Sequence, residues 1–146
     1  MPTLEQVLET NSPHVKIVFK QFPLKMHKAA ASAAAASLVA HGEGKFWEFH
    51  SLMMENFRKL SIEEITNIAI ELGFDEKKFQ SQIKDMVVLK KIQSNIKEGL
   101  EAGVRGVPKI FINGRPLQNR SIKGFQKIID MEMKRLGIQS SKVNKD

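Results

Sequence analysis

The stretch that decides the fold is GVRGVPKIFING, which runs from Gly103 to Gly114. The apolar residues after Pro108 have the composition of a buried strand, and Asn113-Gly114 is the strongest short signal for a two-residue hairpin turn. PKIFING and the RPLQN that follows therefore predict two antiparallel strands. Pro108 stands where the first strand would begin, a position that suits proline because it has no N–H to donate to a strand ladder.

A further strand is predicted over residues 15–22. Val15, Ile17 and Phe19 alternate there with Lys16 and Lys20, as in a strand with one buried face. From residue 26 to residue 103 the pattern is helical, and it returns to strand at the hairpin. This order indicates an α/β chain with a large helical insertion rather than a helical bundle.

Helical periodicity and end signals predict the remaining elements. Ser61 and Glu64 have the spacing of a capping box, in which each side chain bonds the other residue's main-chain N–H. Asp75 and Ser121 are the expected caps of two later helices. The predicted helices cover residues 3–9, 27–42, 45–57, 62–72, 76–100 with a kink, and 122–136.

Composition and charge narrow the possible functions. The 146 residues suit one domain, with 42% hydrophobic and 27% charged residues. The net charge of +7 comes from scattered lysines and arginines, which favours a solvated surface over a nucleic-acid interface. The longest uncharged run, residues 29–40, is too short to span a bilayer, and MPTLE at the start does not resemble a signal peptide. The absence of cysteine excludes disulfides, thiolate metal sites and thiol catalysis within these residues.

No metal site or cofactor is predicted. His27, His41 and His50 match no pair of ligands four residues apart on a helix, and no carboxylate pattern accompanies them. They are interpreted as core or surface histidines.

Apolar side chains at helical spacing are interpreted as core rather than as the lining of a ligand site. Asp130 and Glu132 are interpreted as exposed residues of the closing helix. The expected core residues include Phe46, Trp47, Phe49 and Phe57, and later Phe79, Ile83, Met86, Val87 and Leu89.

Three stretches together resemble the DsbA-like thioredoxin family of thiol-disulfide oxidoreductases. They are VKIVFKQFPL followed by His27 and the alanine-rich helix, then GKFWEFHSLMMEN, then GVRGVPKIFINGRPL, and the resemblance extends over residues 3–136. It implies a thioredoxin-like fold with its thioredoxin-like portion at residues 1–25 and 104–137. It also implies a helical insertion at 26–103 and a flexible tail at 138–146.

By the same resemblance, Val107–Pro108 is the family's cis peptide bond. The resemblance implies that the main chain of Val107 faces outward and pairs with an extended peptide as an added strand. The implied substrate-binding residues are Arg105, Val107 and Pro108. From the residues alone, a trans proline that begins a strand after a glycine-rich loop is the preferred interpretation.

The chain departs from the family at its start. A strand and a Cys-x-x-Cys motif precede the family segment that matches PTLEQVLE, and neither is present. The chain is therefore expected to be an N-terminally truncated member that lacks the central strand of the sheet. Such a gap leaves main-chain groups unpaired. We expect it to be closed by strand exchange in a homo-oligomer, or by a shift of the 15–22 strand to another partner.

Three functions remain open. The first is a truncated disulfide oxidoreductase that is redox-inactive as it stands, because thiol-disulfide exchange needs a thiolate. The second is a cysteine-free peptide-binding or scaffold module that uses the Pro108 loop. The third is an enzyme with a serine nucleophile, for which Ser12, Ser32 and Ser37 lack an activating base. The compartment stays open, although the family is usually periplasmic or otherwise extracytoplasmic when a leader is present.

Overall fold

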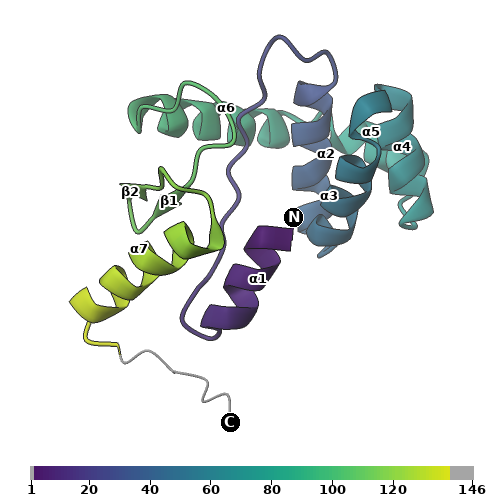
Figure 1. The fold of residues 1–146 in the computed structure, drawn as a ribbon. Coiled ribbons are helices and arrows are strands. Elements are labelled where there is room, and N and C mark those ends of the chain that lie inside the picture. Colours follow the sequence, from purple (N-terminus) through teal and green to yellow (C-terminus); the bar gives the residue numbers. More distant parts are fainter. Residues whose placement is uncertain (1, 139–146) are drawn as a thin grey trace. The chain divides into compact units, whose positions relative to one another are not determined.

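The structure is a computed structural model that describes residues 2–138 (Figure 1). The chain forms two compact units: unit 1 comprises Met1–Phe19 and Pro108–Asp146, and unit 2 comprises Lys20–Val107. The tail predicted after residue 138 lies outside the described residues. In chain order the elements are α1 (Pro2–Asn11), α2 (Ala30–Gly42), α3 (Phe46–Glu55), the 3₁₀ turn η1 (Phe57–Lys59), α4 (Ile62–Glu71), α5 (Glu76–Gln82), α6 (Met86–Glu101), β1 (Phe111–Ile112), β2 (Arg115–Pro116) and α7 (Ile122–Arg135).

Unit 2 is built around α2, which contacts α3, α4, α5 and α6. The alanines on the buried side of α2 have little accessible surface, and Ala36 and Ala40 have none, so neighbouring helices approach closely. Phe49, Ile65 and Phe79 are fully buried in the same core. Burial of each such large side chain stabilises the fold by about 1.5–3 kcal/mol, so this cluster contributes substantially to the stability of unit 2.

The long helix predicted after Asp75 is two helices. Asp75 caps α5 by accepting from the Lys78 N–H at 2.8 Å, and Asp85 caps α6 by accepting from the Val87 N–H at 2.7 Å. The break changes the helical phase, so Met86 and Val87, which were expected to be core residues, are 62% and 75% exposed. Asp85, like Asp75, has a short polar side chain that accepts from a main-chain N–H, which explains why a new helix begins there.

The segment just before the alanine-rich helix lies on one face of α6. The Lys20 ammonium donates to the Glu98 carboxylate at 2.6 Å, and the Gln21 N–H donates to Asn95 Oδ1 at 3.0 Å. The Phe22 ring packs directly on Gly99, since a Cβ atom on Gly99 would lie 2.8 Å from Phe22 Cδ2. These three contacts fix the segment on a helix that lies more than 70 residues later in the sequence.

The core of unit 1 lies between α1 and α7, which contact each other. Val7, Phe125 and Ile129 are buried there, with Leu117 and Met133. A reciprocal amide pair joins the two helices: Gln126 Nε2 donates to Asn11 Oδ1 at 2.9 Å, and Asn11 Nδ2 donates to Gln126 Oε1 at 3.1 Å. The predicted cap of α7 is confirmed, since Ser121 Oγ accepts from the Gly124 N–H.

The predicted hairpin is confirmed. Phe111 pairs with Pro116 and Ile112 with Arg115 in an antiparallel ladder. Asn113 and Gly114 have φ values of 47° and 81°, as a type I′ turn requires. The ladder begins three residues after Pro108, so the proline lies in the loop before the strand and not at its first residue.

The strand predicted at residues 15–22 does not form a ladder. Residues 15–24 run without helix, turn or strand (Figure 1). The predicted alternation is nevertheless present, because Val15, Ile17 and Phe19 are half-buried while Lys16 and Val18 are exposed. The side-chain pattern of a strand is encoded locally, whereas a ladder needs a partner strand, and none pairs with this segment within residues 2–138. An α/β fold was expected. Within residues 2–138 the chain forms a mostly helical thioredoxin-like domain whose two strands make one short hairpin.

Candidate functional site

The loop that carries the three expected binding residues is exposed. Val104 anchors its start, since it is buried and its N–H donates to the Gly99 carbonyl at 2.8 Å. Arg105 and Pro108 are exposed, and Val107 is 51% exposed. Within residues 2–138, the Arg105 guanidinium donates to its neighbour, the Val104 carbonyl, at 3.3 Å. The loop therefore presents main chain and one cation to solvent.

The cis bond expected at Val107–Pro108 is a wrong prediction. Among the described residues the cis peptide bond is Ser12–Pro13, and Val107–Pro108 is trans. The trans form of an X-Pro bond is favoured by about 0.5–1 kcal/mol. No buried contact of the exposed Val107 or Pro108 opposes that preference in the structure.

Unit 1 contains a second stretch whose main-chain N–H and C=O groups could pair with another strand. Within residues 2–138, the main-chain groups of Val15, Lys16, Ile17 and Val18 have no hydrogen-bond partner. Val15 packs on the α1–α7 core, while Val18 on the opposite face is 65% exposed. A row of consecutive main-chain groups without partners is typical of a sheet edge, so this segment has the properties of an incomplete sheet edge.

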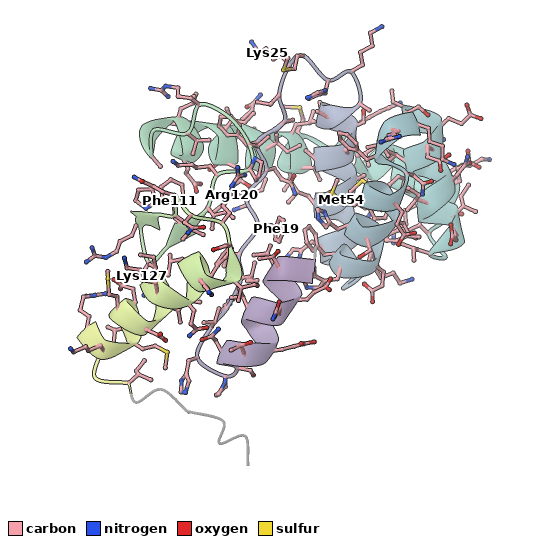
Figure 2. The ribbon with its side chains drawn as sticks, in the orientation of Figure 1. Phe19, Lys25, Met54, Phe111, Arg120 and Lys127 are labelled. Atoms are coloured by element: carbon pink, nitrogen blue, oxygen red, sulfur yellow. The ribbon has the colours of Figure 1, made fainter. Side chains whose placement is uncertain are left out.

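The hairpin presents another such edge. The Leu117 N–H donates to the Ile110 carbonyl at 2.8 Å. Since antiparallel pairs alternate, the main-chain groups of Phe111 point away from β2. The Phe111 side chain is 36% exposed, and the Lys109 ammonium lies 5.9 Å from its ring centroid. Figure 2 marks Phe111 on the hairpin and Lys127 on α7, both in unit 1.

Glu132 holds the hairpin against α7, and its predicted exposure is wrong. The residue is only 4% exposed. Its carboxylate accepts from Arg135 Nη2 at 2.8 Å and Nε at 3.0 Å, from Arg115 Nε at 2.7 Å and from Asn113 Nδ2 at 3.2 Å. These bonds, those from Arg135 foremost, lower the pKa of Glu132 to about 2. The only sequence signal for this cluster was an arginine three residues further along the helix.

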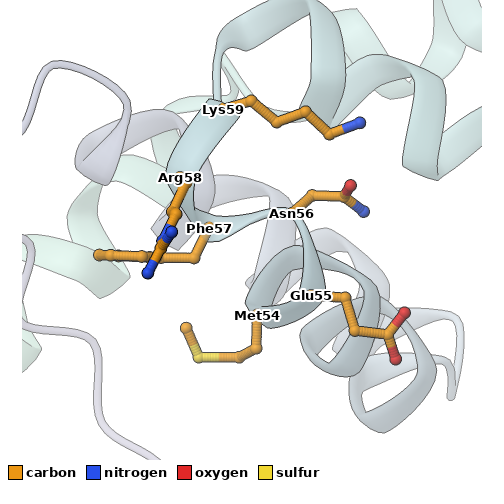
Figure 3. A pocket seen from close by; sticks show the side chains of 6 residues that line it. All are labelled: Met54, Glu55, Asn56, Phe57, Arg58 and Lys59. Carbon is orange, nitrogen blue, oxygen red and sulfur yellow. The ribbon is translucent and has the colours of Figure 1, made fainter.

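A shallow hollow of about 450 Å³ lies at the end of α3 in unit 2. It is lined by six consecutive residues, from Met54 to Lys59 (Figure 3). Met54 and Phe57 are 45% and 61% exposed. Phe57 was expected to be a core residue; the helix ends at Glu55, so the periodicity that would have buried Phe57 stops before it.

Two of the histidines lie against Phe46 in unit 2. Within residues 2–138, no group of three histidine or carboxylate side chains could hold a metal ion. His50 stacks on Phe46 with ring centroids 5.6 Å apart, and burial lowers the pKa of His50. His41 meets the same Phe46 ring edge-on at 6.3 Å. Both histidines therefore belong to an aromatic cluster in unit 2.

The comparison with protein families identifies the family of the chain. A family model described as thioredoxin matches residues 2–131. The chain therefore belongs to the thioredoxin family, and the resemblance to its DsbA-like members is confirmed.

Similar curated proteins carry the name Na(+)/H(+) antiporter. NhaA 1 of Salinispora arenicola is 28% identical over 115 residues, which cover 78% of this chain and 18% of that protein. NhaA 3 of Salinispora tropica is 29% identical over 102 residues, which cover 69% and 16%. NhaA of Nitrosospira multiformis is 29% identical over 115 residues, which cover 76% and 18%. The chain thus spans less than a fifth of the length of these relatives. In the part of the chain that the structure describes, no helix has the length and apolar character needed to cross a membrane.

Proposed function

We propose that these residues form a redox-inactive thioredoxin-like domain that binds an extended polypeptide. The observation that carries the proposal is the combination of a thioredoxin-family sequence with no cysteine at any of its 146 positions. The exposed main chain around Val107, with Arg105 and Pro108 beside it, supports peptide recognition by added-strand hydrogen bonds. The proposal does not depend on the geometry of the Val107–Pro108 bond.

Redox inactivity follows from chemistry. Thiol-disulfide exchange proceeds by thiolate attack on a disulfide sulfur, and these residues supply no thiolate. In an insulin-reduction assay with dithiothreitol, the rate of precipitation should equal that of the protein-free blank. A rate above the blank, with the purified 146-residue chain, would contradict the proposal.

Peptide binding is tested at Val107. If recognition uses the main chain, Val107→Ala should retain peptide affinity, whereas Val107→Pro should lose it because proline has no N–H to donate. The assay is fluorescence anisotropy with a panel of labelled extended peptides, with circular dichroism as the check that both variants fold. Equal loss in both variants would indicate that the side chain, and not the main chain, is recognised.

A second candidate is a thiol-disulfide oxidoreductase of which these residues are one part. The match to the thioredoxin family favours this candidate. The test is the intact mass of the protein from its native cells. A mass several kilodaltons above that of residues 1–146, with a cysteine pair in the added segment, supports this candidate. A mass equal to that of these residues supports the cysteine-free binding domain.

A further inference from the structure

We propose that Asn113 is a modification site: its side-chain amide is lost by deamidation, and the aspartate or isoaspartate that results releases the hairpin from α7. This inference does not rest on the peptide binding proposed above. Its basis is a single exposed residue that is followed by glycine and whose amide donates to the buried carboxylate of Glu132.

The reaction is intramolecular and consumes only water. The main-chain nitrogen of Gly114, once solvent hydroxide has taken its proton, attacks Asn113 Cγ. The new N–Cγ bond closes a cyclic imide, and the Cγ–Nδ2 bond breaks to release ammonia. Water that opens the imide at Cγ gives aspartate, whereas water that opens it at the main-chain carbonyl carbon gives isoaspartate. The sum is one water consumed and one ammonia released, at a residue type that is chemically labile.

The turn leaves the attacking nitrogen accessible. Asn113 and Gly114 are both exposed, and within residues 2–138 the Gly114 N–H donates no hydrogen bond. A Cβ atom on Gly114 would have nothing within 4 Å, and glycine has no side chain of its own to crowd the approach. The bond from Asn113 Nδ2 to Glu132 is, at 3.2 Å, the longest of those that this carboxylate accepts, so it is the weakest of them.

The other asparagines of the chain lack this combination. Each is followed by a residue with a side chain: Ser12, Phe57, Ile68, Ile96, Arg120 or Lys145. Asn119 is the most informative comparison, because it is also exposed and belongs to the same unit, but the nitrogen that would attack it is that of Arg120. Asn113 is therefore the expected first site of reaction.

The charge of the product acts directly on the contact between the hairpin and α7. Glu132 is 4% exposed, and Asn113 is one of the three residues that donate to it. After deamidation a carboxylate stands where the donor was. The hydrogen bond is lost, and two like charges face each other in a place sheltered from water, where their repulsion is strong. The modified side chain must therefore move away from α7.

Isoaspartate adds a change in the main chain. It inserts one extra carbon into a two-residue turn that closes a ladder of two pairs, Phe111 with Pro116 and Ile112 with Arg115. Because the turn sets the register of so short a hairpin, the lengthened turn does not hold both pairs in place. Both products thus loosen the hairpin.

The test incubates the purified 146-residue chain, folded, at mildly alkaline pH and follows the mass gain of about 1 Da that replacement of an amide by a carboxyl group produces. Fragment-ion sequencing locates the gain, and reversed-phase chromatography separates the two products. Modification at Asn113 should be at least about tenfold faster than at Asn119, because only Gly114 presents an uncrowded nitrogen. A synthetic peptide with the sequence of residues 111–116 shows that the conditions permit the reaction. If that peptide reacts while Asn113 of the folded chain does not, or if Asn119 reacts first, the assignment of the site is overturned.

Two variants test the release of the hairpin. Asn113→Gly is the matched control, since Gly-Gly suits a type I′ turn and has no amide to lose. Asn113→Asp carries the charge of the product without the reaction. The readout is amide exchange at Leu117, whose N–H donates to the Ile110 carbonyl across the hairpin. Exchange there should be about tenfold faster in Asn113→Asp than in Asn113→Gly. Equal exchange in the two variants, or unchanged exchange in the modified natural chain, overturns the release of the hairpin.

Discussion

Replacement of Gly124 by alanine is the sharpest test of the packing in unit 1. Gly124 lies in the first turn of α7, where a Cβ atom would be 2.1 Å from the Asn119 carbonyl oxygen and 2.8 Å from its carbonyl carbon. The obstacle is main chain and cannot rotate away. The loop from Asn119 to Ser121 also forms the helix cap, since Asn119 Oδ1 accepts from the Ser121 N–H and Ser121 Oγ accepts from the Gly124 N–H.

Two effects oppose each other in the Gly124→Ala variant. Alanine in place of glycine stabilises a helix by about 1 kcal/mol. Overpacking typically costs about 1–3 kcal/mol, and loss of the cap a further 1 kcal/mol or so. We therefore expect a net destabilisation of about 2 kcal/mol. With a urea m-value of about 1–3 kcal/mol/M, the midpoint should fall by about 1 M.

Gly42→Ala is the control for helix propensity alone. Gly42 is the last residue of α2, and a Cβ atom there would have nothing within 4 Å. This variant should be unchanged or more stable, by up to about 1 kcal/mol. The measurement is urea unfolding followed by circular dichroism, with amide exchange in α7 as the local reading. If Gly124→Ala is as stable as Gly42→Ala, the assigned contact between α7 and the Asn119 loop is incorrect.

Three more predictions follow from named contacts. Because the folded-state pKa of Glu132 is lowered from 4.5 to about 2, the ionised carboxylate contributes fully to stability above pH 4.5, and this contribution is lost as the pH falls toward 2. Glu132→Gln should remove this part of the acid dependence of unfolding. Asp130→Asn, on the same helix, should not. Gly99→Ala, whose Cβ would lie 2.8 Å from Phe22 Cδ2, should destabilise unit 2 by about 1 kcal/mol, and Phe22→Leu should relieve the clash in a double-mutant cycle. Asp85→Ala removes the cap on the Val87 N–H and should cost about 1 kcal/mol in urea unfolding, with faster amide exchange in the first turn of α6 as its local sign.

Features encoded by a few adjacent residues were predictable from the sequence. The Asn113-Gly114 turn has the backbone angles that its two residues favour. Ser61 accepts from the Glu64 N–H at 3.1 Å, which is one half of the predicted capping box, whereas the Glu64 carboxylate pairs with Lys59 at 3.4 Å. For the turn and for the Ser61 cap, the physical cause lies within four residues along the chain.

Features that depend on distant partners were missed. Glu132 is buried because Arg115 and Asn113 reach it from the hairpin, which periodicity on α7 alone does not reveal. The 15–22 pattern is that of a strand, but whether a ladder forms depends on a neighbour. At the candidate site, the exposure of Arg105, Val107 and Pro108 is compatible with the implied role, whereas the cis bond carried over from the family is absent.

The Asn11–Gln126 amide pair has a consequence for the order of folding. It joins residues 115 positions apart, and unit 1 is assembled from the two ends of the chain, which precede and follow unit 2 in the sequence. Contacts between such distant residues form late, because the loop-closure entropy must be overcome first. During synthesis, all residues of unit 2 are available once Val107 has left the ribosome. The buried face of α1 has no packing partner until α7 has been made. A ribosome stalled between these two points would therefore hold a finished helical unit and an N-terminal helix whose apolar face still lacks its partner.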